Sequence, residues 1–407
     1  MPSIFSANRT LTRPLPAEVS LAVACCSWPP GELGDARIRS SAPSLDWTLF
    51  DAVVRRNRIT PLVHHALKRT RVTLPEAYEH ELTQRALATA RRSLVMAAES
   101  LRLQRELDAA GLRSMIVKGV PLGILAFGDC ALKESADIDV LVAPDSVAEA
   151  GRLLLGLGYE IVFPTIDLAD FVGHGREAIF IHPHKRITTE LHWQLIDHRG
   201  LHAELSVDSP AQDVALAGGS LRTLADGPMF AFLCLHGTAH NWSRLKWLAD
   251  LSAFAATRPP RELEGLFAAT DAYHAKRSAS VALLLCKRLM NLSLSDSLRR
   301  SIEANSVTRA LQRNVFAGLA YRGGGQEHVA YSMPWVRMMV AQFFAEPGLT
   351  RIAEQIRILW TLPTDRGSIS LPRQLTFVYH LLRLPLWIGR IAQRSIERRG
   401  RRKHRES

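Results

Sequence analysis

The chain has 407 residues, of which 47% are hydrophobic and 22% are charged, which fits a globular protein of two or three modest domains rather than a disordered chain. The 51 lysines and arginines against 39 acidic residues give a formal net charge of +12. This balance suits an anionic partner, such as a nucleotide, a nucleic acid or lipid headgroups, without choosing among them.

The cysteines and the apolar runs bear on the location of the chain. The five cysteines include no Cys-x-x-Cys pair and no zinc spacing, which favours a reduced, cytoplasmic protein. The apolar stretch at residues 21–26 is too short for the core of a signal peptide. No run of about 18 apolar residues occurs, so we expect no transmembrane helix.

The first elements in chain order are helical. Residues 1–40 carry Pro, Ser and Gly without periodicity, which predicts a poorly ordered N-terminus. Residues 41–111 form an N-terminal helical region, which ends at Gly111 as a left-handed glycine after the last helical turn. Its helices are expected at residues 45–56, 61–69 and 75–110.

A compact α/β unit is expected over residues 112–226. An apolar strand at residues 114–117 is followed by the turn Lys118-Gly119 and by a helix that starts near Pro121. A helix at residues 145–155 begins at Asp145 as its N-cap. The remaining strands are expected at residues 137–142, 159–163, 177–182 and 187–195, the last two as an antiparallel pair in a small mixed sheet.

Two aspartates lie in the strand that begins at Asp137. Side chains alternate along a strand, so Asp137 and Asp139 point the same way. Ile138, Val140 and Val142 point the other way, into a core. Two carboxylates about 5 Å apart repel by roughly 3 kcal/mol at an effective dielectric near 20, and a divalent metal ion would offset this. A pair of solvated aspartates at a loop edge fits the dipeptide pattern equally well.

A third carboxylate, Glu190, follows on a later strand. The same alternation places Glu190 and His192 on one face, in a segment that is otherwise apolar. Glu190 is therefore the candidate that completes a metal site with the two aspartates. The alternative is a glutamate at the edge of the sheet.

Lys118 ends the first strand beside these carboxylates and next to a helix N-terminus. It can meet a phosphate there as a point charge. Its loss should then weaken nucleotide binding and leave the melting temperature nearly unchanged. The alternative is a surface lysine at a strand end.

Residues 227–395 read as a C-terminal helical domain, followed by a basic disordered tail at residues 396–407. His236 and His240 share a helix face. They would either bind zinc, for which no third ligand is evident, or pack against each other and their neighbours without a metal. Lys246 is expected to pair with Asp250 four residues on. Trp242 and Trp247 stack a base or, more commonly, pack in a core. The tail offers contact with an anionic surface.

These pieces together resemble a nucleotidyltransferase of the DNA polymerase beta superfamily. More narrowly, they are similar to a family of uncharacterised bacterial nucleotidyltransferases often found beside peptide or polysaccharide biosynthesis genes. The resemblance covers residues 117–251, about a third of the chain. Its pieces are Val117-Lys118-Gly119, Phe127-Gly128-Asp129, Asp137-Ile138-Asp139-Val140-Leu141-Val142, Leu157-Gly158-Tyr159, Glu190-Leu191-His192-Trp193, Leu233-Cys234-Leu235-His236-Gly237 and Arg244-Leu245-Lys246-Trp247-Leu248-Ala249-Asp250-Leu251.

With the order of the elements, the resemblance implies an α+β protein. A small mixed β-sheet nucleotidyltransferase core is flanked by N-terminal helices and a C-terminal helical domain. It implies that Asp137, Asp139 and Glu190 are catalytic and hold Mg²⁺ or Mn²⁺. The substrate would be a nucleoside triphosphate, with ATP as the first candidate. The enzyme would transfer the nucleoside monophosphate to an unknown acceptor, in peptide or polysaccharide biosynthesis.

The nucleotide-binding residues also follow from the resemblance. Lys118 and Gly119 stand where the broader superfamily has a Gly-Ser turn. Lys133 stands where an arginine is expected, and lysine lacks its bidentate fork. His240 and Lys246 would face the cleft. Two other classes remain open, namely a non-catalytic nucleotide- or partner-binding module on the same fold, and a nucleic-acid or membrane-surface binder that uses the basic tail.

Overall fold

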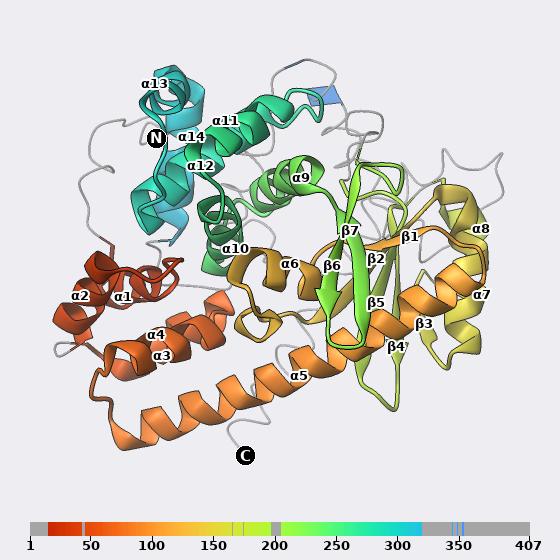
Figure 1. Cartoon of the computed structure of the whole chain (residues 1–407), viewed down its shortest axis with the longest axis horizontal. Coiled ribbons are helices and arrows are strands. Elements are labelled where there is room, and N and C mark those ends of the chain that lie inside the picture. The colour runs from red at the N-terminus through yellow and green to blue at the C-terminus, as the bar shows by residue number, and fades with distance from the viewer. Residues whose placement is uncertain are drawn as a thin grey trace, which may run out of the picture.

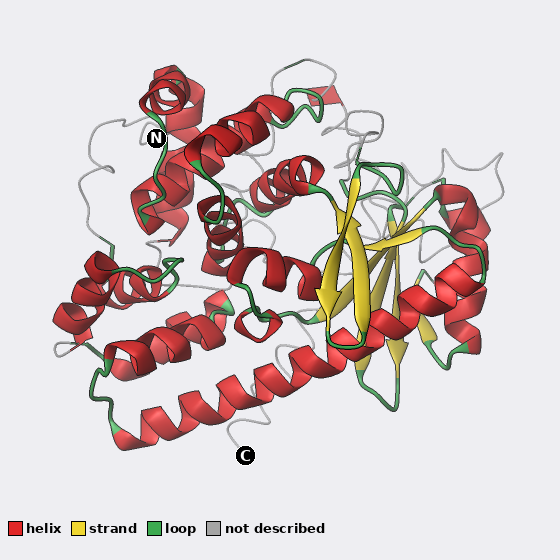
Figure 2. Cartoon of the chain, viewed as in Figure 1, coloured by secondary structure: helices red, strands yellow, loops and turns green. Residues whose placement is uncertain are grey.

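The computed structural model describes residues 15–319 apart from 43–44, 165, 174 and 197–204, together with residues 344, 348 and 352–353. It is a mixed α and β structure, in which most helices lie to one side of the strands (Figure 2). No helix in the described part is long and apolar enough to cross a membrane. The other residues of the segment 320–407, including the basic tail, lie outside the described residues.

Five helices open the described chain: α1 (Ala17–Cys25), α2 (Glu32–Ser41), α3 (Trp47–Asn57), α4 (Thr60–Thr70) and α5 (Glu76–Ala109). The expectation of a poorly ordered N-terminus is wrong for α1 and α2. Leu21 and Val23 of α1 are almost completely buried. Because α1 is apolar nearly all round, it shows no amphipathic period, although it is a core helix.

A five-stranded sheet has the order β1-β2-β5-β4-β3. Its strands are β1 (Ser114–Ile116), β2 (Asp137–Val142), β3 (Glu160–Phe163), β4 (Glu177–His182) and β5 (Ile187–His192). β2 and β5 are parallel, while all other neighbours are antiparallel, so the sheet is mixed as expected. The helices α6 (Gly119–Phe127), α7 (Val147–Gly156) and α8 (Leu168–Phe171) connect these strands.

The two faces of the sheet have different roles. Ile138, Val140 and Val142 of β2 lie in a core with residues of α5 and α7, and α5 crosses in front of the strands in Figure 1. Asp139 lies on the opposite face, and its Cα partner on β5 is Glu190. Because a slip of one residue would turn every side chain to the other face, this register brings the two carboxylates together.

The long helix α5 fixes the start of both central strands. Arg92 donates hydrogen bonds from Nη2 to the carbonyl of Ala136 at 2.9 Å and from Nη1 to the carbonyl of Arg186 at 3.4 Å. Ala136 precedes β2 and Arg186 precedes β5, so one guanidinium holds both entry points.

Glu99 of α5 anchors the β4–β5 turn. Its carboxylate accepts hydrogen bonds from Tyr159 Oη at 2.8 Å and Lys185 Nζ at 2.7 Å, and it pairs with Arg102. Burial would raise the pKa of Glu99, but these partners hold it at about 2. The network ties the turn to the helix.

The rest of the described chain adds a hairpin and six helices. The hairpin of β6 (Ala211–Leu216) and β7 (Gly219–Leu224) was not expected. The expected N-cap at Asp145 is wrong by one residue, because Asp145 lies in a 3₁₀ turn, Ser146 is the N-cap and α7 starts at Val147. The helices are α9 (Asp226–Ala239), α10 (Leu245–Ala256), α11 (Pro260–Ala269), α12 (Lys276–Met290), α13 (Asp296–Ala304) and α14 (Ser306–Leu319).

The N-terminal and C-terminal helices share one hydrophobic core. Phe50 of α3, Phe230 of α9 and Leu283 of α12 belong to the same buried cluster, together with Leu122 of α6. The helices at the two ends of the described chain therefore enclose one side of the sheet unit together.

We predict that Leu21→Ala lowers the free energy of unfolding by about 2–5 kcal/mol, because it removes a fully buried side chain of α1 and leaves a cavity. Leu33→Ala in α2 is the matched control, since Leu33 is 80% exposed and its loss should change the value by less than about 0.5 kcal/mol. Equal values from denaturant unfolding would mean that α1 does not pack in the core.

We predict that Glu99→Gln lowers the free energy of unfolding at pH 7 by about 1–3 kcal/mol, because Lys185 and Arg102 lose the charge of their shared hydrogen-bond acceptor. Because the folded pKa is depressed, this stabilisation is present above the unfolded pKa near 4.5 and is lost as the pH falls toward 2. The difference in the free energy of unfolding between wild type and Glu99→Gln, measured by denaturant unfolding, should therefore become smaller below pH 4.5. Glu160→Gln, at an exposed edge position, is the control and should change the free energy of unfolding at pH 7 by less than about 0.5 kcal/mol.

Candidate active site

Asp139, Glu190 and His192 form a compact group on the open face of the sheet. One potential ligand atom from each lies within 4.8 Å of the others. Asp139 is 2% exposed and His192 is equally buried, while Glu190 is half-buried. In the described part of the chain, this is the one group of three or more acidic, histidine or cysteine side chains with that geometry.

A cleft of about 330 Å³ opens over this group, between the sheet and the helices α6, α9 and α10. Asp137 lines the cleft but does not belong to the compact group. Side chains of both charges line its walls. The basic residues are Arg58, Lys118, Lys133, Arg176, Arg244 and Lys246, and the acidic residues are Glu134, Asp137, Asp139, Glu177, Glu190 and Asp250.

Lys118 lies inside the cleft as an ion-pair partner of the central carboxylate. Its Nζ is 2.7 Å from Asp139 Oδ1. Burial alone would lower the pKa of the Lys118 ammonium, but the charge of Asp139 raises it. The following Gly119 has φ +58, a left-handed conformation that favours glycine and turns the chain into α6.

His192 bridges the carboxylates. Its Nε2 is 3.2 Å from Asp139 Oδ1 and 3.3 Å from Glu190 Oε2, and its Nδ1 is 3.3 Å from Glu177 Oε2. Burial would lower the pKa of His192, but the bonds to Asp139 and Glu190 raise it to about 9. The ring is thus a cation that helps to neutralise the buried acids.

The pKa values of the three carboxyl groups shift in opposite directions. Burial opposes ionisation of Asp139, yet Lys118 and His192 lower its pKa. The hydrogen bond from His192 also lowers the pKa of Glu190. The pKa of Asp137 is raised, first by burial and then by the negative charges of Asp139 and Glu190. The negative charges of Asp139 and Glu190 therefore disfavour ionisation of Asp137, which is the repulsion that the sequence predicts. The charge of Asp139, in contrast, is offset by Lys118 and His192.

The donor set fits a divalent metal ion. Potential ligand atoms of two carboxylates and an imidazole lie within 4.8 Å of one another, and the cations that now offset the carboxylates are Lys118 and His192. Carboxylate oxygens suit Mg²⁺ and Mn²⁺, while an added imidazole favours Mn²⁺ or zinc over Mg²⁺.

Lys133 and Asp250 form an ion pair across the cleft wall. Lys133 Nζ is 2.5 Å from Asp250 Oδ2, and both side chains are buried. The expected pairing of Asp250 with Lys246 is wrong, because Asp250 pairs with Lys133 instead. Sequence spacing favours neighbours on one helix, whereas this pair joins residues 117 positions apart.

Aromatic rings of α9 and α10 line the same cleft. His240 stacks on Trp247, with centroids 4.7 Å apart and planes at 14°, and the centroid of His236 is 4.7 Å from that of His240. Burial, and then the charge of Lys118, lowers the pKa of His236 well below its usual value. Trp242 is fully buried, whereas Trp247 reaches the cleft.

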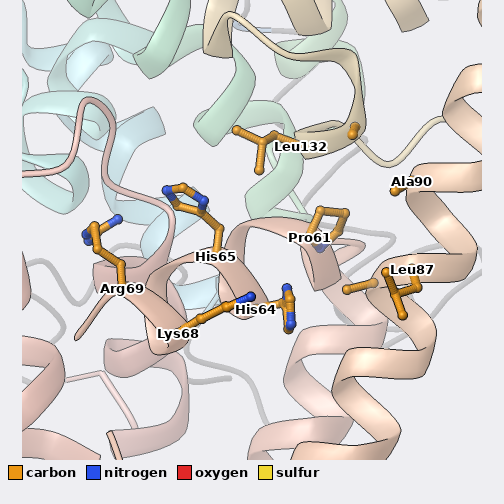
Figure 3. Close-up of a pocket in the computed structure, with 10 residues that line it drawn as sticks. Pro61, His64, His65, Lys68, Arg69, Leu87, Ala90 and Leu132 are labelled. Carbon is orange, nitrogen blue, oxygen red and sulfur yellow. The ribbon is translucent and has the colours of Figure 1, made fainter. Parts of the chain in front are cut away.

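A second groove, of about 400 Å³, lies between α4, α5 and the turn Cys130–Leu132 (Figure 3). Leu132 borders this groove, while the next residue, Lys133, borders the cleft. The groove is lined by His64, Lys68 and Leu87 among others and by no carboxylate. It therefore lacks the acidic donors of the cleft.

Sequence reasoning missed several cleft residues. His192 was noted only as a neighbour of Glu190 on the same face, although its position two residues on is the signal for a shared site. Arg176 immediately precedes β4 and Glu177 is its first residue, and the ion pair between them, at 2.9 Å, was not predicted. Arg58 comes from the N-terminal helices, and no local pattern points to it.

We predict that Lys118→Met lowers the free energy of unfolding of the metal-free protein by about 3 kcal/mol, because it leaves a buried carboxylate with one partner fewer. This reverses the expectation of an unchanged melting temperature. Added Mn²⁺ should restore part of the loss. Lys246→Met is the control from the same cleft and should not destabilise, since burial, and then Lys133, depresses the pKa of Lys246. Similar melting of both variants would contradict the central role of the Lys118–Asp139 pair.

The comparison with known families covers most of the regions just described. Residues 43–291, more than half of the chain, match the model of a family described as uncharacterised nucleotidyltransferases. The match begins after α2 and extends from α3 through the sheet to the end of α12. No curated protein matches the chain significantly. The chain thus belongs to this family of uncharacterised nucleotidyltransferases.

Proposed function

We propose that this protein is a metal-dependent nucleotidyltransferase that moves a nucleoside monophosphate from a nucleoside triphosphate, ATP first, to an acceptor of unknown identity. One observation carries the proposal. Asp139 and Glu190 are Cα partners on parallel strands and face a cleft that is also lined by basic side chains. Membership of the family supports a nucleotide substrate.

Asp139 and Glu190, with Asp137 beside them, are the residues that would hold Mg²⁺ or Mn²⁺, and His192 orients the first two. The bound metal would stabilise the charge on the phosphate oxygens and orient them. His192 bonds to both carboxylates and so restricts their rotation, which preorganises the site.

The basic side chains would hold the phosphates. Lys118 lines the cleft, and its ammonium lies 2.7 Å from Asp139, which would hold the metal ion. Because phosphate oxygens would bind that metal ion, a small shift of Lys118 would bring it to one of them. We assign Lys118, Gly119, Lys133, His240 and Lys246 to nucleotide binding. The acceptor oxygen would then form a bond to the α-phosphorus, the bond from that phosphorus to the β-bridging oxygen would break, and pyrophosphate would leave.

The finer assignments rest on motif resemblance and belong to the same proposal. They are a place in the DNA polymerase beta superfamily, a bacterial and cytoplasmic setting, and a role in peptide or polysaccharide biosynthesis. The contact of the basic tail with an anionic surface is a separate hypothesis about residues 396–407.

A non-catalytic nucleotide- or partner-binding module is the second candidate. The observation that favours it is the Lys118–Asp139 pair, which neutralises the central carboxylate without a metal ion. The same fold would then bind a ligand without transferring a group.

We predict that Asp139→Asn and Glu190→Gln each reduce metal-dependent transfer by on the order of 100-fold or more, the scale expected when one electrostatic partner of a transition state is lost. The measurement is pyrophosphate release with each of the four nucleoside triphosphates and Mg²⁺ or Mn²⁺. Asp213→Asn, on the exposed β6 strand, is the control and should keep wild-type activity. A wild type that binds nucleotide and metal but releases no pyrophosphate would favour the non-catalytic module.

A further inference from the structure

Arg58 reaches the cleft from outside the α/β unit. It directly follows α3 and has φ 51 and ψ 54, a left-handed conformation that is uncommon for a residue with a side chain. It lines the same cleft as the carboxylates of β2 and β5. The N-terminal helices thus contribute a cation to the candidate active site.

The neighbouring residue holds this corner in place. Asn57 is 3% exposed, and its Nδ2 donates to the carbonyl of Val53 at 2.8 Å. Its Oδ1 accepts a hydrogen bond from the backbone N–H of Leu245, also at 2.8 Å. Leu245 is the first residue of α10, so the corner between α3 and α4 is fixed to the helix start that carries Lys246.

Positive charge accumulates at this helical wall of the cleft. Arg58, Lys133 and Lys246 all line it, while Asp250 is already paired with Lys133. Neither Arg58 nor Lys246 has an ion-pair partner among the described residues. Burial, and then the charges of Lys133 and Arg58, lower the pKa of Lys246 to about 8, although Asp250 and Asp137 act in the opposite direction. These cations therefore lie close enough to repel one another.

We propose that Arg58, together with Lys133 and Lys246, forms the subsite for the β- and γ-phosphates of the nucleotide. The inference rests on the proposed function and adds a residue to it. A polyphosphate tail carries several negative charges. It would meet Arg58 and Lys246, which have no ion-pair partner among the described residues, beside Lys133, whose partner is Asp250. The planar fork of Arg58 can bind two phosphate oxygens at once, which Lys133 and Lys246 cannot do.

The position of the subsite agrees with the chemistry of transfer. The metal-binding carboxylates lie on the sheet, whereas the three cations come from the α3–α4 corner, the loop before β2 and the start of α10. A triphosphate between the two walls would meet carboxylate-bound metal on one side and cations on the other. The cations would then bind the part of the substrate that leaves as pyrophosphate.

The test uses Arg58→Asn in the full-length protein, because asparagine tolerates the left-handed conformation and removes only the cation. Arg71→Asn is a matched control. Arg71 has the same left-handed conformation after α4, with φ 54, but it is exposed and does not line the cleft. The probe is tripolyphosphate without metal, and its dissociation constant is measured by titration calorimetry.

We expect Arg58→Asn to weaken tripolyphosphate binding by about 10-fold to 100-fold, as for the loss of a hydrogen-bonded charged partner. Arg71→Asn should bind like the wild type, and both variants should melt within a few degrees of it. Arg58→Lys should give an intermediate affinity, since it keeps the charge and loses the fork. Lys246→Ala should also weaken binding.

Three results would overturn the inference. The first is an equal affinity of the wild type and Arg58→Asn for tripolyphosphate, and the second is a wild type that does not bind tripolyphosphate. The third is an equal loss of affinity in Arg58→Asn and Arg71→Asn, which would indicate an effect of net charge alone. The proposed function is judged separately by pyrophosphate release and its loss in Asp139→Asn. Tripolyphosphate binding through Arg58 without any transfer would thus retain the subsite and reject the enzyme.

Discussion

The ionised carboxylate of Asp139 is the constraint on which the rest of this structure depends. It is 2% exposed, and a buried charge without partners would cost several kcal/mol. Lys118 and His192 supply these partners, and each is itself buried or nearly so. The position of Lys118 at the end of β1 and the phase of β5 are therefore coupled to one side chain on β2.

Helix α5 maintains this arrangement from the opposite side of the sheet. Arg92 bonds to the backbone before β2 and before β5, and Glu99 holds the turn that leads into β5. β2 and β5 are neighbours in the sheet, but β3 and β4 lie between them in the sequence. A tight turn therefore cannot set their parallel pairing. A single straight helix of 34 residues provides the common reference for both.

The sequence predicted what local periodicity controls. The predicted bounds of β2 and β4 are those of the structure. Alternation placed the aspartates of β2 opposite Ile138, Val140 and Val142, because successive side chains of a strand point to opposite faces even where both faces are buried, as in β2. Helix α1 was missed because a helix that is apolar nearly all round has no amphipathic period to detect. The Lys133–Asp250 pair and the entry of Arg58 into the cleft depend on tertiary contacts between distant segments, which no spacing rule contains.

The hydrogen bond between Asn57 and Leu245 has a consequence for how the protein is made. The two residues are 188 positions apart, and the core that surrounds them joins α3 to α9 and α12. During synthesis from the N-terminus, the first helices emerge long before the helices that bury them. Their apolar faces must remain exposed on the ribosome until about residue 290 has left the exit tunnel, so chaperone binding to the nascent chain is expected to be concentrated on α1 to α4.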